Sequence, residues 1–233
     1  MTDSLPTVCI PGLACSARLY QDQIPALWTV GPVTIARPTQ HEHIGAIARS
    51  ILAAAPERFA LVGLSMGGYV GFEILRQAPT RVAKLALLDT SARPDTPEQS
   101  ENRRAQIRLA ATLPPREIAD AMFPRLVHRS RHGDERLREI FRLMAEEVGG
   151  AAYARQQTAI ISRPDSRPML PGIRCPTLVV VGDGDELTPP PVAAEMASRI
   201  PGARLVTVAG CGHACTLERP AEVTAALLEW ARG

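Results

Sequence analysis

Ser65 lies at the centre of Gly63-Leu64-Ser65-Met66-Gly67, a G-x-S-x-G pattern between a predicted buried strand and a predicted helix. A strand that turns sharply into a helix strains its central residue and leaves room only for small flanking residues, which glycine supplies. The serine oxygen then stands above the sheet, beside helix N–H groups whose partial positive charge suits an oxyanion. The pattern predicts a nucleophilic serine. The alternative is a small-residue turn that only lets the helix pack on the strand.

A serine hydroxyl needs a general base at neutral pH, and that base is usually a histidine. Of the five histidines, only His213 lies in a turn directly after the last predicted strand and before a terminal helix. We therefore expect it at the carboxyl edge of the sheet, together with the nucleophile. His41 and His43 follow an earlier strand at the same edge and are weaker candidates. His128 and His132 fall in a helical segment and are interpreted as surface residues.

A carboxylate that orients the histidine completes such a site. Asp183 and Asp185 both follow the strand predicted over residues 177–181, again at the carboxyl edge, and Asp89 ends another strand. The order serine, acid, histidine along the chain is the one expected on this kind of sheet. Spacing alone does not separate Asp183 from Asp185.

The loop after the first predicted strand, Pro11-Gly12-Leu13-Ala14, is the expected second part of the oxyanion site. Gly12 allows its backbone to bend towards the serine. The N–H of Leu13 would then pair with the N–H of Met66 to hold an oxyanion.

Short apolar runs alternate with helix-like stretches, which is typical of a parallel sheet with helices on both faces. Strands are predicted at residues 7–10, 33–36, 59–64, 82–88, 177–181 and 204–208, and helices at 45–55, 66–77 and 221–231. Between residues 91 and 170 helical patterns replace the strands. We therefore expect an α/β core of residues 1–90 and 171–233, with a helical lid of residues 91–170 inserted.

Apolar side chains of this predicted lid would line a substrate pocket: Met122, Phe123, Leu126, Met144 and Tyr153. An apolar stripe at helical spacing runs through Leu137, Ile140, Phe141, Met144 and Val148, and such a stripe is more often core than pocket. The sequence does not fix which face of a helix each side chain takes.

The composition argues against several classes of partner. The formal net charge is +2, and the arginines are scattered rather than clustered on a basic face, as nucleic-acid binding would require. The odd number of cysteines, five, favours free thiols in a reducing cytoplasm. The amino-terminal stretch MTDSLPTVCIPG lacks a secretory signal pattern, and no apolar run reaches the roughly 20 residues of a membrane span. We expect a cytoplasmic protein.

Two further motifs do not indicate a cofactor. Cys211, His213 and Cys215 alternate, but no second ligand pair stands nearby to complete a zinc site. Gly182-Asp183-Gly184 begins like a dinucleotide fingerprint but lacks the third glycine, and its acids would repel a phosphate. We therefore expect neither a metal nor a cofactor.

On these residues the chain resembles the α/β-hydrolase superfamily. Gly63-Leu-Ser-Met-Gly-Gly is similar to the elbow of enol-lactonases and small carboxylesterases. Gly182-Asp-Gly-Asp-Glu-Leu-Thr-Pro resembles the family's acid loop, in which the aspartate stands three residues after the glycine. Gly212-His-Ala-Cys-Thr-Leu-Glu-Arg-Pro220 resembles the histidine loop. The resemblance implies the family's α/β fold and favours Asp185 over Asp183 as the acid.

The chain departs from the family pattern at three points. Pro11-Gly12 stands where a His-Gly pair is common, and the loop after residues 33–36 lacks the usual Asp and Gly-rich segment. The sheet is expected to begin at the family's third strand, so that six strands replace eight.

The residues and the resemblance together predict an enzyme that cleaves a carboxylic ester or lactone of a small molecule through an acyl-enzyme. Hydrolysis of a carbon–carbon bond, perhydrolysis and non-catalytic binding of a small molecule are the alternatives, since fold does not fix chemistry. The oligomeric state is not predicted.

Overall fold

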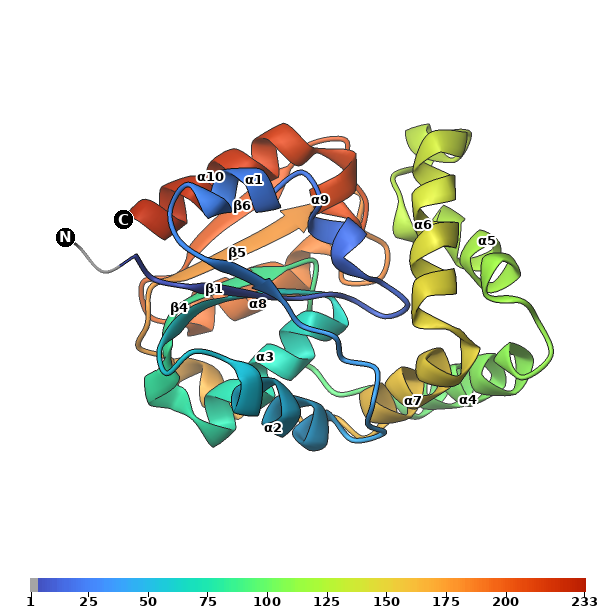
Figure 1. Cartoon of the computed structure of the whole chain (residues 1–233), viewed down its shortest axis with the longest axis horizontal. Coiled ribbons are helices and arrows are strands. Elements are labelled where there is room, and N and C mark those ends of the chain that lie inside the picture. Colours follow the sequence, from blue (N-terminus) through green and yellow to red (C-terminus); the bar gives the residue numbers. More distant parts are fainter. Residues whose placement is uncertain (1–3) are drawn as a thin grey trace.

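Six parallel strands form one sheet in the order β2-β1-β3-β4-β5-β6 in the computed structural model, which describes residues 4–233 (Figure 1). The strands are β1 (Thr7–Ile10), β2 (Val33–Ile35), β3 (Phe59–Leu64), β4 (Val82–Leu88), β5 (Thr177–Gly182) and β6 (Arg204–Val208). Residues 1–3, at the start of the amino-terminal stretch that lacks a secretory signal pattern, lie outside the described residues.

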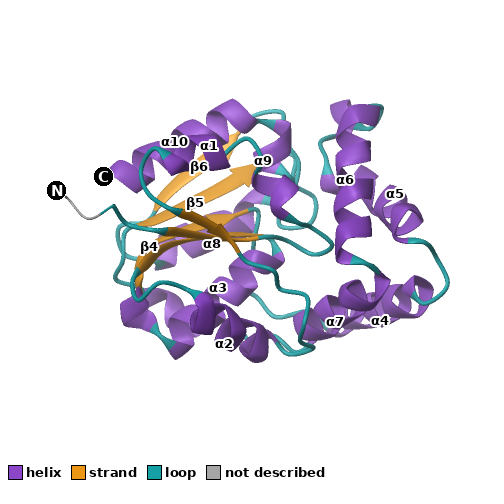
Figure 2. Cartoon of the chain, viewed as in Figure 1, coloured by secondary structure: helices purple, strands orange, loops and turns teal. Residues whose placement is uncertain are grey.

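Helices cover both faces of this sheet (Figure 2). On one face lie α2 (Ile44–Ala54), α3 (Met66–Gln77) and α8 (Pro190–Arg199). On the other lie α1 (Ile24–Trp28), α9 (Cys215–Glu218) and α10 (Pro220–Arg232). Short 3-10 turns are η1 (Ala17–Tyr20), η2 (Pro79–Arg81), η3 (Arg129–Arg131) and η4 (Arg167–Gly172).

The central strands β3, β4 and β5 consist almost entirely of apolar residues, because both of their faces are buried; Lys84, near the start of β4, is the charged exception. Successive side chains of a strand point to opposite faces of the sheet. Leu61 and Leu85 accordingly join the core beneath α2, α3 and α8. Their neighbours Val62 and Ala86 join the core beneath α1 and α10. This double core fixes the strand ends, and the loops that follow them, at one edge.

Four helices lie between β4 and β5: α4 (Pro97–Ala110), α5 (Pro115–Leu126), α6 (Glu135–Val148) and α7 (Gly150–Ile161). They stand beside the carboxyl edge of the sheet, where α5 packs on α6 and α4 packs on α7 (Figure 1). Leu137, Phe141 and Met144 of the predicted apolar stripe are buried there, as a core interpretation requires.

The predicted α/β architecture, a parallel sheet of six strands with helices on both faces, is confirmed. Three helices of the core, α1, α8 and the four-residue α9, are not indicated by the sequence pattern. Pro190 and Pro191 look like a break, yet proline is tolerated in the first turn of a helix, where its missing N–H costs nothing. The five residues of α1 are too few for a visible period.

None of the helices within residues 4–233 is long and apolar enough to cross a membrane. The five cysteines all lie in the described part of the chain and are free thiols.

Candidate active site

Ser65 forms the turn between β3 and α3 and has a left-handed backbone, with φ 54° and ψ −117°. A Cβ at Gly63 would lie 2.5 Å from the carbonyl oxygen of Gly67, and one at Gly67 would lie 2.0 Å from that of Ile10. Neither approach is possible for a real side chain, so only glycine lets α3 start this close to the strands. The strained turn is the arrangement that the G-x-S-x-G pattern predicts.

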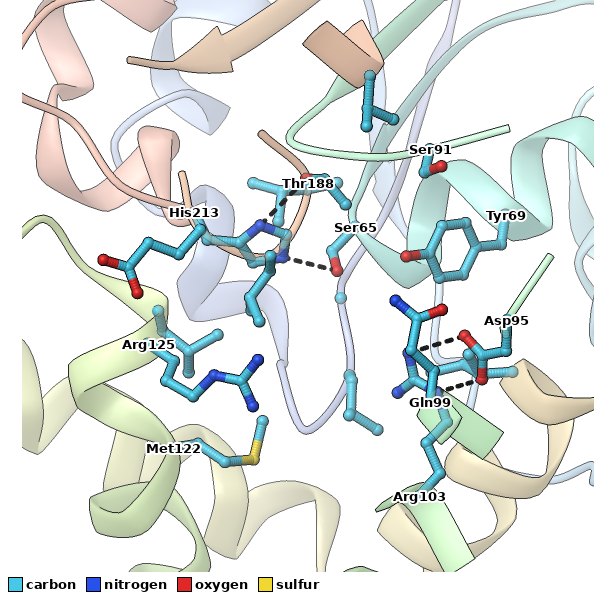
Figure 3. A pocket seen from close by; sticks show the side chains of 18 of the residues that line it. Ser65, Tyr69, Ser91, Asp95, Gln99, Arg103, Met122, Arg125, Thr188 and His213 are labelled. Carbon is cyan, nitrogen blue, oxygen red and sulfur yellow. Dashed lines mark hydrogen bonds and ion pairs between the residues drawn. The ribbon is translucent and has the colours of Figure 1, made fainter. Parts of the chain in front are cut away.

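Ser65, His213 and Asp185 lie in hydrogen-bonding order, although they are far apart in the chain. Ser65 Oγ is 2.8 Å from His213 Nε2, and His213 Nδ1 is 2.8 Å from Asp185 Oδ2. Figure 3 shows the imidazole turned towards the serine. An ionised carboxylate accepts the Nδ1 proton, which leaves Nε2 free to accept the hydroxyl proton.

Asp185 is fixed by its own loop. Its Oδ1 accepts from the N–H groups of Leu187 (2.8 Å) and Thr188 (3.0 Å), and its Oδ2 accepts from the hydroxyl of Thr188 (2.7 Å). Asp183 instead accepts from the N–H of Cys211 and is exposed. The structure therefore brings Asp185, and not Asp183, to the imidazole of His213.

The carboxylate and the imidazole shift each other's pKa in opposite directions. Burial would raise the pKa of Asp185, but the charge and hydrogen bond of His213, with the hydrogen bonds of Thr188, lower it from 3.8 to about 2. Burial would lower the pKa of His213, but the charge and hydrogen bond of Asp185 outweigh it and raise that pKa above 6.5. At neutral pH Asp185 is therefore ionised, and the imidazole is a stronger base than a free histidine.

Asp89, the third candidate acid, is buried at the end of β4. Its two carboxylate oxygens accept from the N–H groups of Gly182 and Cys215, each at 3.0 Å. Burial, followed by repulsion from Asp185, raises the pKa of Asp89 to about 7. Its hydrogen bonds join the backbone of the acid loop to that of the histidine loop, so it holds the two loops together.

Glu218 is a second buried carboxylate behind the histidine loop. It accepts from the N–H of Gly212 at 2.8 Å and from the N–H of His128 at 2.7 Å. His128 follows α5, so this side chain links the histidine loop to the inserted helices. Burial raises the pKa of Glu218.

The two N–H groups predicted for the oxyanion site belong to Leu13 and Met66. A Cβ on Gly12 would lie 3.4 Å from the Cβ of Ser65, so the loop after β1 passes directly beside Ser65. Met66 is the first residue of α3, and the first N–H groups of a helix have no acceptor within it. Both residues thus lie next to Ser65 in the backbone that surrounds it.

Gln156 of α7 holds this loop from the side of the inserted helices. It is fully buried, its Oε1 accepts from the N–H of Ala14 at 3.0 Å, and its Nε2 donates to the carbonyl of Pro38 at 3.0 Å. Ala14 has φ 57°, a conformation that a non-glycine residue keeps only when its surroundings enforce it. The sequence does not single out Gln156, because a lone glutamine in a helix carries no local signal.

Ser65 and His213 open into a cavity of about 390 Å³ between the sheet edge and the inserted helices. Leu13 lines it, together with Met122 and Leu126, two of the residues predicted for a substrate pocket. A site of this size is typical for a small molecule.

Three residues predicted for the pocket do not line this cavity. Phe123 and Met144 are fully buried, and the ring of Phe123 meets that of Phe141 edge-on at 5.7 Å. The hydroxyl of Tyr153 accepts from Gln157 Nε2 at 2.8 Å, behind the wall. Tertiary packing turns these side chains into the helical core, and Phe141 of the stripe reaches the cavity instead.

Much of the cavity wall is polar, whereas the sequence pattern predicts only apolar side chains there. Residues of α4 and the segment before it contribute Asp95, Thr96, Gln99, Asn102, Arg103 and Gln106. Asp95 pairs with Arg103 and with Arg163, each at 2.7 Å. In a sequence, a polar helix face predicts exposure to water. The polar face of α4 does face open space, but this space is the cavity.

Known proteins resemble this chain over nearly its whole length. The model of the alpha/beta hydrolase family matches residues 8–227. A pimeloyl-[acyl-carrier protein] methyl ester esterase of Aromatoleum aromaticum is 28% identical over 209 residues, 84% of this chain and 83% of the relative.

Two solved structures share the whole fold. A thermophilic esterase from Thermogutta terrifontis, solved with malate bound, is 32% identical with a TM-score of 0.88, covering 98% of this chain and 89% of its own. The enol-lactonase from Burkholderia xenovorans LB400 is 25% identical with a TM-score of 0.88, covering 99% and 92% of the two chains.

The hydrogen bonds of Gln156 predict a cost for its removal. Gln156→Ala leaves the N–H of Ala14 and the carbonyl of Pro38 without partners, so we expect the free energy of unfolding to fall by about 1–3 kcal/mol in urea denaturation. Gln21→Ala, at an exposed glutamine, is the control and changes stability by no more than about 0.5 kcal/mol. Equal stability of Gln156→Ala and the wild type would show that α7 does not hold the loop.

Proposed function

Since the chain belongs to the alpha/beta hydrolase family, we propose that it hydrolyses a carboxylic ester or lactone of a small molecule through an acyl-enzyme on Ser65. The observation that carries the proposal is the unbroken line of hydrogen bonds from Ser65 through His213 to Asp185 at the floor of a cavity. The names of the similar proteins, two esterases and an enol-lactonase, support ester chemistry.

Acylation begins when Ser65 Oγ attacks the carbonyl carbon of the ester while His213 Nε2 takes the hydroxyl proton. The imidazolium that forms is stabilised by the ionised Asp185. Collapse of the tetrahedral intermediate breaks the bond to the alcohol oxygen, and His213 returns its proton to that oxygen. The alcohol leaves, and the acyl group stays on Ser65. In a lactone the alcohol remains tethered to the acyl chain.

Deacylation repeats these steps with water as the nucleophile. His213 Nε2 takes a proton from the water, and the oxygen attacks the acyl carbon. The bond to Ser65 Oγ then breaks, and the serine recovers its proton from the imidazolium. The products are a carboxylic acid and the free enzyme.

The N–H groups of Leu13 and Met66 are the proposed donors to the oxyanion in both tetrahedral intermediates. The removal of one such donor from a serine protease costs about 3–4 kcal/mol in the transition state. The rigid elbow and the hydrogen bond from Ala14 to Gln156 support this role, because donors that are already in place need no reorganisation during the reaction.

The helices α4–α7, within residues 91–170, are the proposed lid that selects the substrate. They supply Met122, Leu126 and the polar wall of the cavity. Their contacts with the core include the carboxylate of Glu147, which accepts from Ser16 Oγ at 2.5 Å and pairs with Arg18 at 2.6 Å. This lid is therefore attached directly to the loop that carries the proposed oxyanion donor.

Loss of the Ser65 hydroxyl tests the nucleophile. Ser65→Ala has no atom to attack the ester, so hydrolysis of p-nitrophenyl butyrate should fall by about 10⁴-fold or more, and labelling by a fluorophosphonate probe should vanish. Ser198→Ala is the matched control, because its hydroxyl bonds only to the carbonyl of Glu195 on the surface of α8.

Residual ester hydrolysis or labelling in Ser65→Ala at the wild-type level would contradict the mechanism. Binding of small esters by the wild type without turnover and without labelling would identify a non-catalytic binding protein instead.

The pH dependence of the rate tests the pair of His213 and Asp185. Only neutral imidazole accepts a proton, and the pKa of His213 is raised above 6.5, so kcat/KM should fall as the pH drops through a value above 6.5. Asp185→Asn removes the charge that raises this pKa but leaves the burial that lowers it. The acid limb should therefore move to lower pH, while the rate falls by about 10⁴-fold, as for the equivalent change in a serine protease.

Asp183→Asn is the control for this profile, since Asp183 bonds to the backbone of Cys211 rather than to the imidazole. An acid limb that stays in place in Asp185→Asn, or that moves in Asp183→Asn, would contradict the assigned pair.

A further inference from the structure

Positive charge predominates in the cavity wall above Ser65. Four arginines and two acids line it: Arg93, Arg103, Arg125, Arg163, Asp95 and Glu186. Arg93 and Arg125 are exposed residues, so water solvates their guanidinium groups in the free protein. A wholly apolar ester that covered such a group would remove this water without replacing its hydrogen bonds, which is costly. The excess of arginines calls for an anionic partner.

Three of these arginines already have carboxylate partners within the protein. Arg103 and Arg163 share the single carboxylate of Asp95, at 2.7 Å each. Arg93 pairs with Glu195 outside the cavity, at 2.7 Å. The side chain of Asp95 is only 1% exposed, so this pair of arginines around one acid is a fixed part of the wall that carries one surplus positive charge.

Arg125 differs from these three. Within residues 4–233 its guanidinium has neither a hydrogen bond nor an ion pair, and Figure 3 shows it reaching into the cavity beside Met122. It lies across the cavity from Asp95 and Arg103 in that view. Glu186, the other acid of the lining, is exposed and forms no ion pair with it. The donors of Arg125 are therefore available to a ligand.

We propose that the substrate is an ester or lactone that carries a carboxylate away from the reacting bond, and that Arg125 binds this carboxylate. The planar guanidinium matches a carboxylate in two parallel hydrogen bonds, an arrangement that also fixes the orientation of a substrate. The reacting ester group is neutral and takes its place at Ser65. The surplus positive charge around Asp95 adds to the positive potential of the cavity, which favours the entry of an anionic substrate. This assignment rests on the proposed function and adds the substrate class.

Three series of methyl esters of equal chain length test the charge preference. The first series has a terminal carboxylate (monomethyl succinate and monomethyl adipate), the second a terminal methyl group and the third a terminal ammonium group. We expect kcat/KM of the wild type to follow the order anionic, neutral, cationic. Arg125→Gln should reduce the ratio of anionic to neutral kcat/KM about tenfold or more, mainly through KM, because the ion pair is equally present in bound substrate and transition state.

Arg129→Gln is the matched control. Arg129 is an exposed arginine in η3, directly after the end of α5, and does not line the cavity. Its substitution removes the same charge nearby but should leave the ratio at the wild-type value. Arg125→Glu extends the series, because it should turn the preference towards the cationic ester.

A second test uses the wild type alone and so does not depend on whether a variant folds. Raising the salt concentration screens an exposed charge, so the ratio of anionic to neutral kcat/KM should fall as NaCl is added. A wild type without preference for the anionic esters, or an Arg125→Gln variant that keeps the preference, would overturn the assignment.

The outcomes separate this inference from the proposed function. If Ser65-dependent hydrolysis occurs with all three series at similar kcat/KM, the substrate class is wrong and the ester hydrolase stands. If none of the esters is hydrolysed and Ser65 is not labelled, both are wrong.

Discussion

The hydrogen bond between His213 Nδ1 and Asp185 Oδ2 is the interaction on which the site depends. It fixes the imidazole so that Nε2 faces Ser65, and it raises the pKa of His213, the base of the proposed reaction. The parallel sheet makes this pairing possible, because the carboxyl ends of β3 and β5, and the loop after β6, meet at one edge. Asp89 then ties the acid loop to the histidine loop from beneath, through two backbone N–H groups.

The inserted helices do more than cover this edge. Gln156 of α7 holds the loop after β1, and Glu218 of α9 holds the N–H of His128 after α5. The loops around Ser65 are therefore fixed from the sheet below and from the helices above. The same helices supply much of the cavity wall, and Arg125 is the arginine of that wall that has no hydrogen bond or ion pair within residues 4–233. In the account proposed here, one layer both positions the reacting groups and selects the substrate.

The reacting groups were predictable from the sequence, and the cavity wall largely was not. Ser65, His213 and Asp185 each follow a strand within a short motif, so local sequence places them at the sheet edge without knowledge of distant contacts. Neighbouring residues of a helix point about 100° apart, and Met122 therefore faces the cavity while Phe123 packs against Phe141. The packing of α5 against α6 decides which face of α5 points into the cavity, and no sequence motif predicts this packing. The start of α8 was also not predictable from its prolines, because proline is accepted both in the first turn of a helix and in a loop.

A crystal structure of the protein after reaction with a phosphonate ester would show which groups surround the reacting atom. We expect phosphorus bonded to Ser65 Oγ, a phosphoryl oxygen within hydrogen-bonding distance of the N–H groups of Leu13 and Met66, and His213 still paired with Asp185. An adduct on another residue, or a phosphoryl oxygen that points away from both N–H groups, would contradict the proposed mechanism.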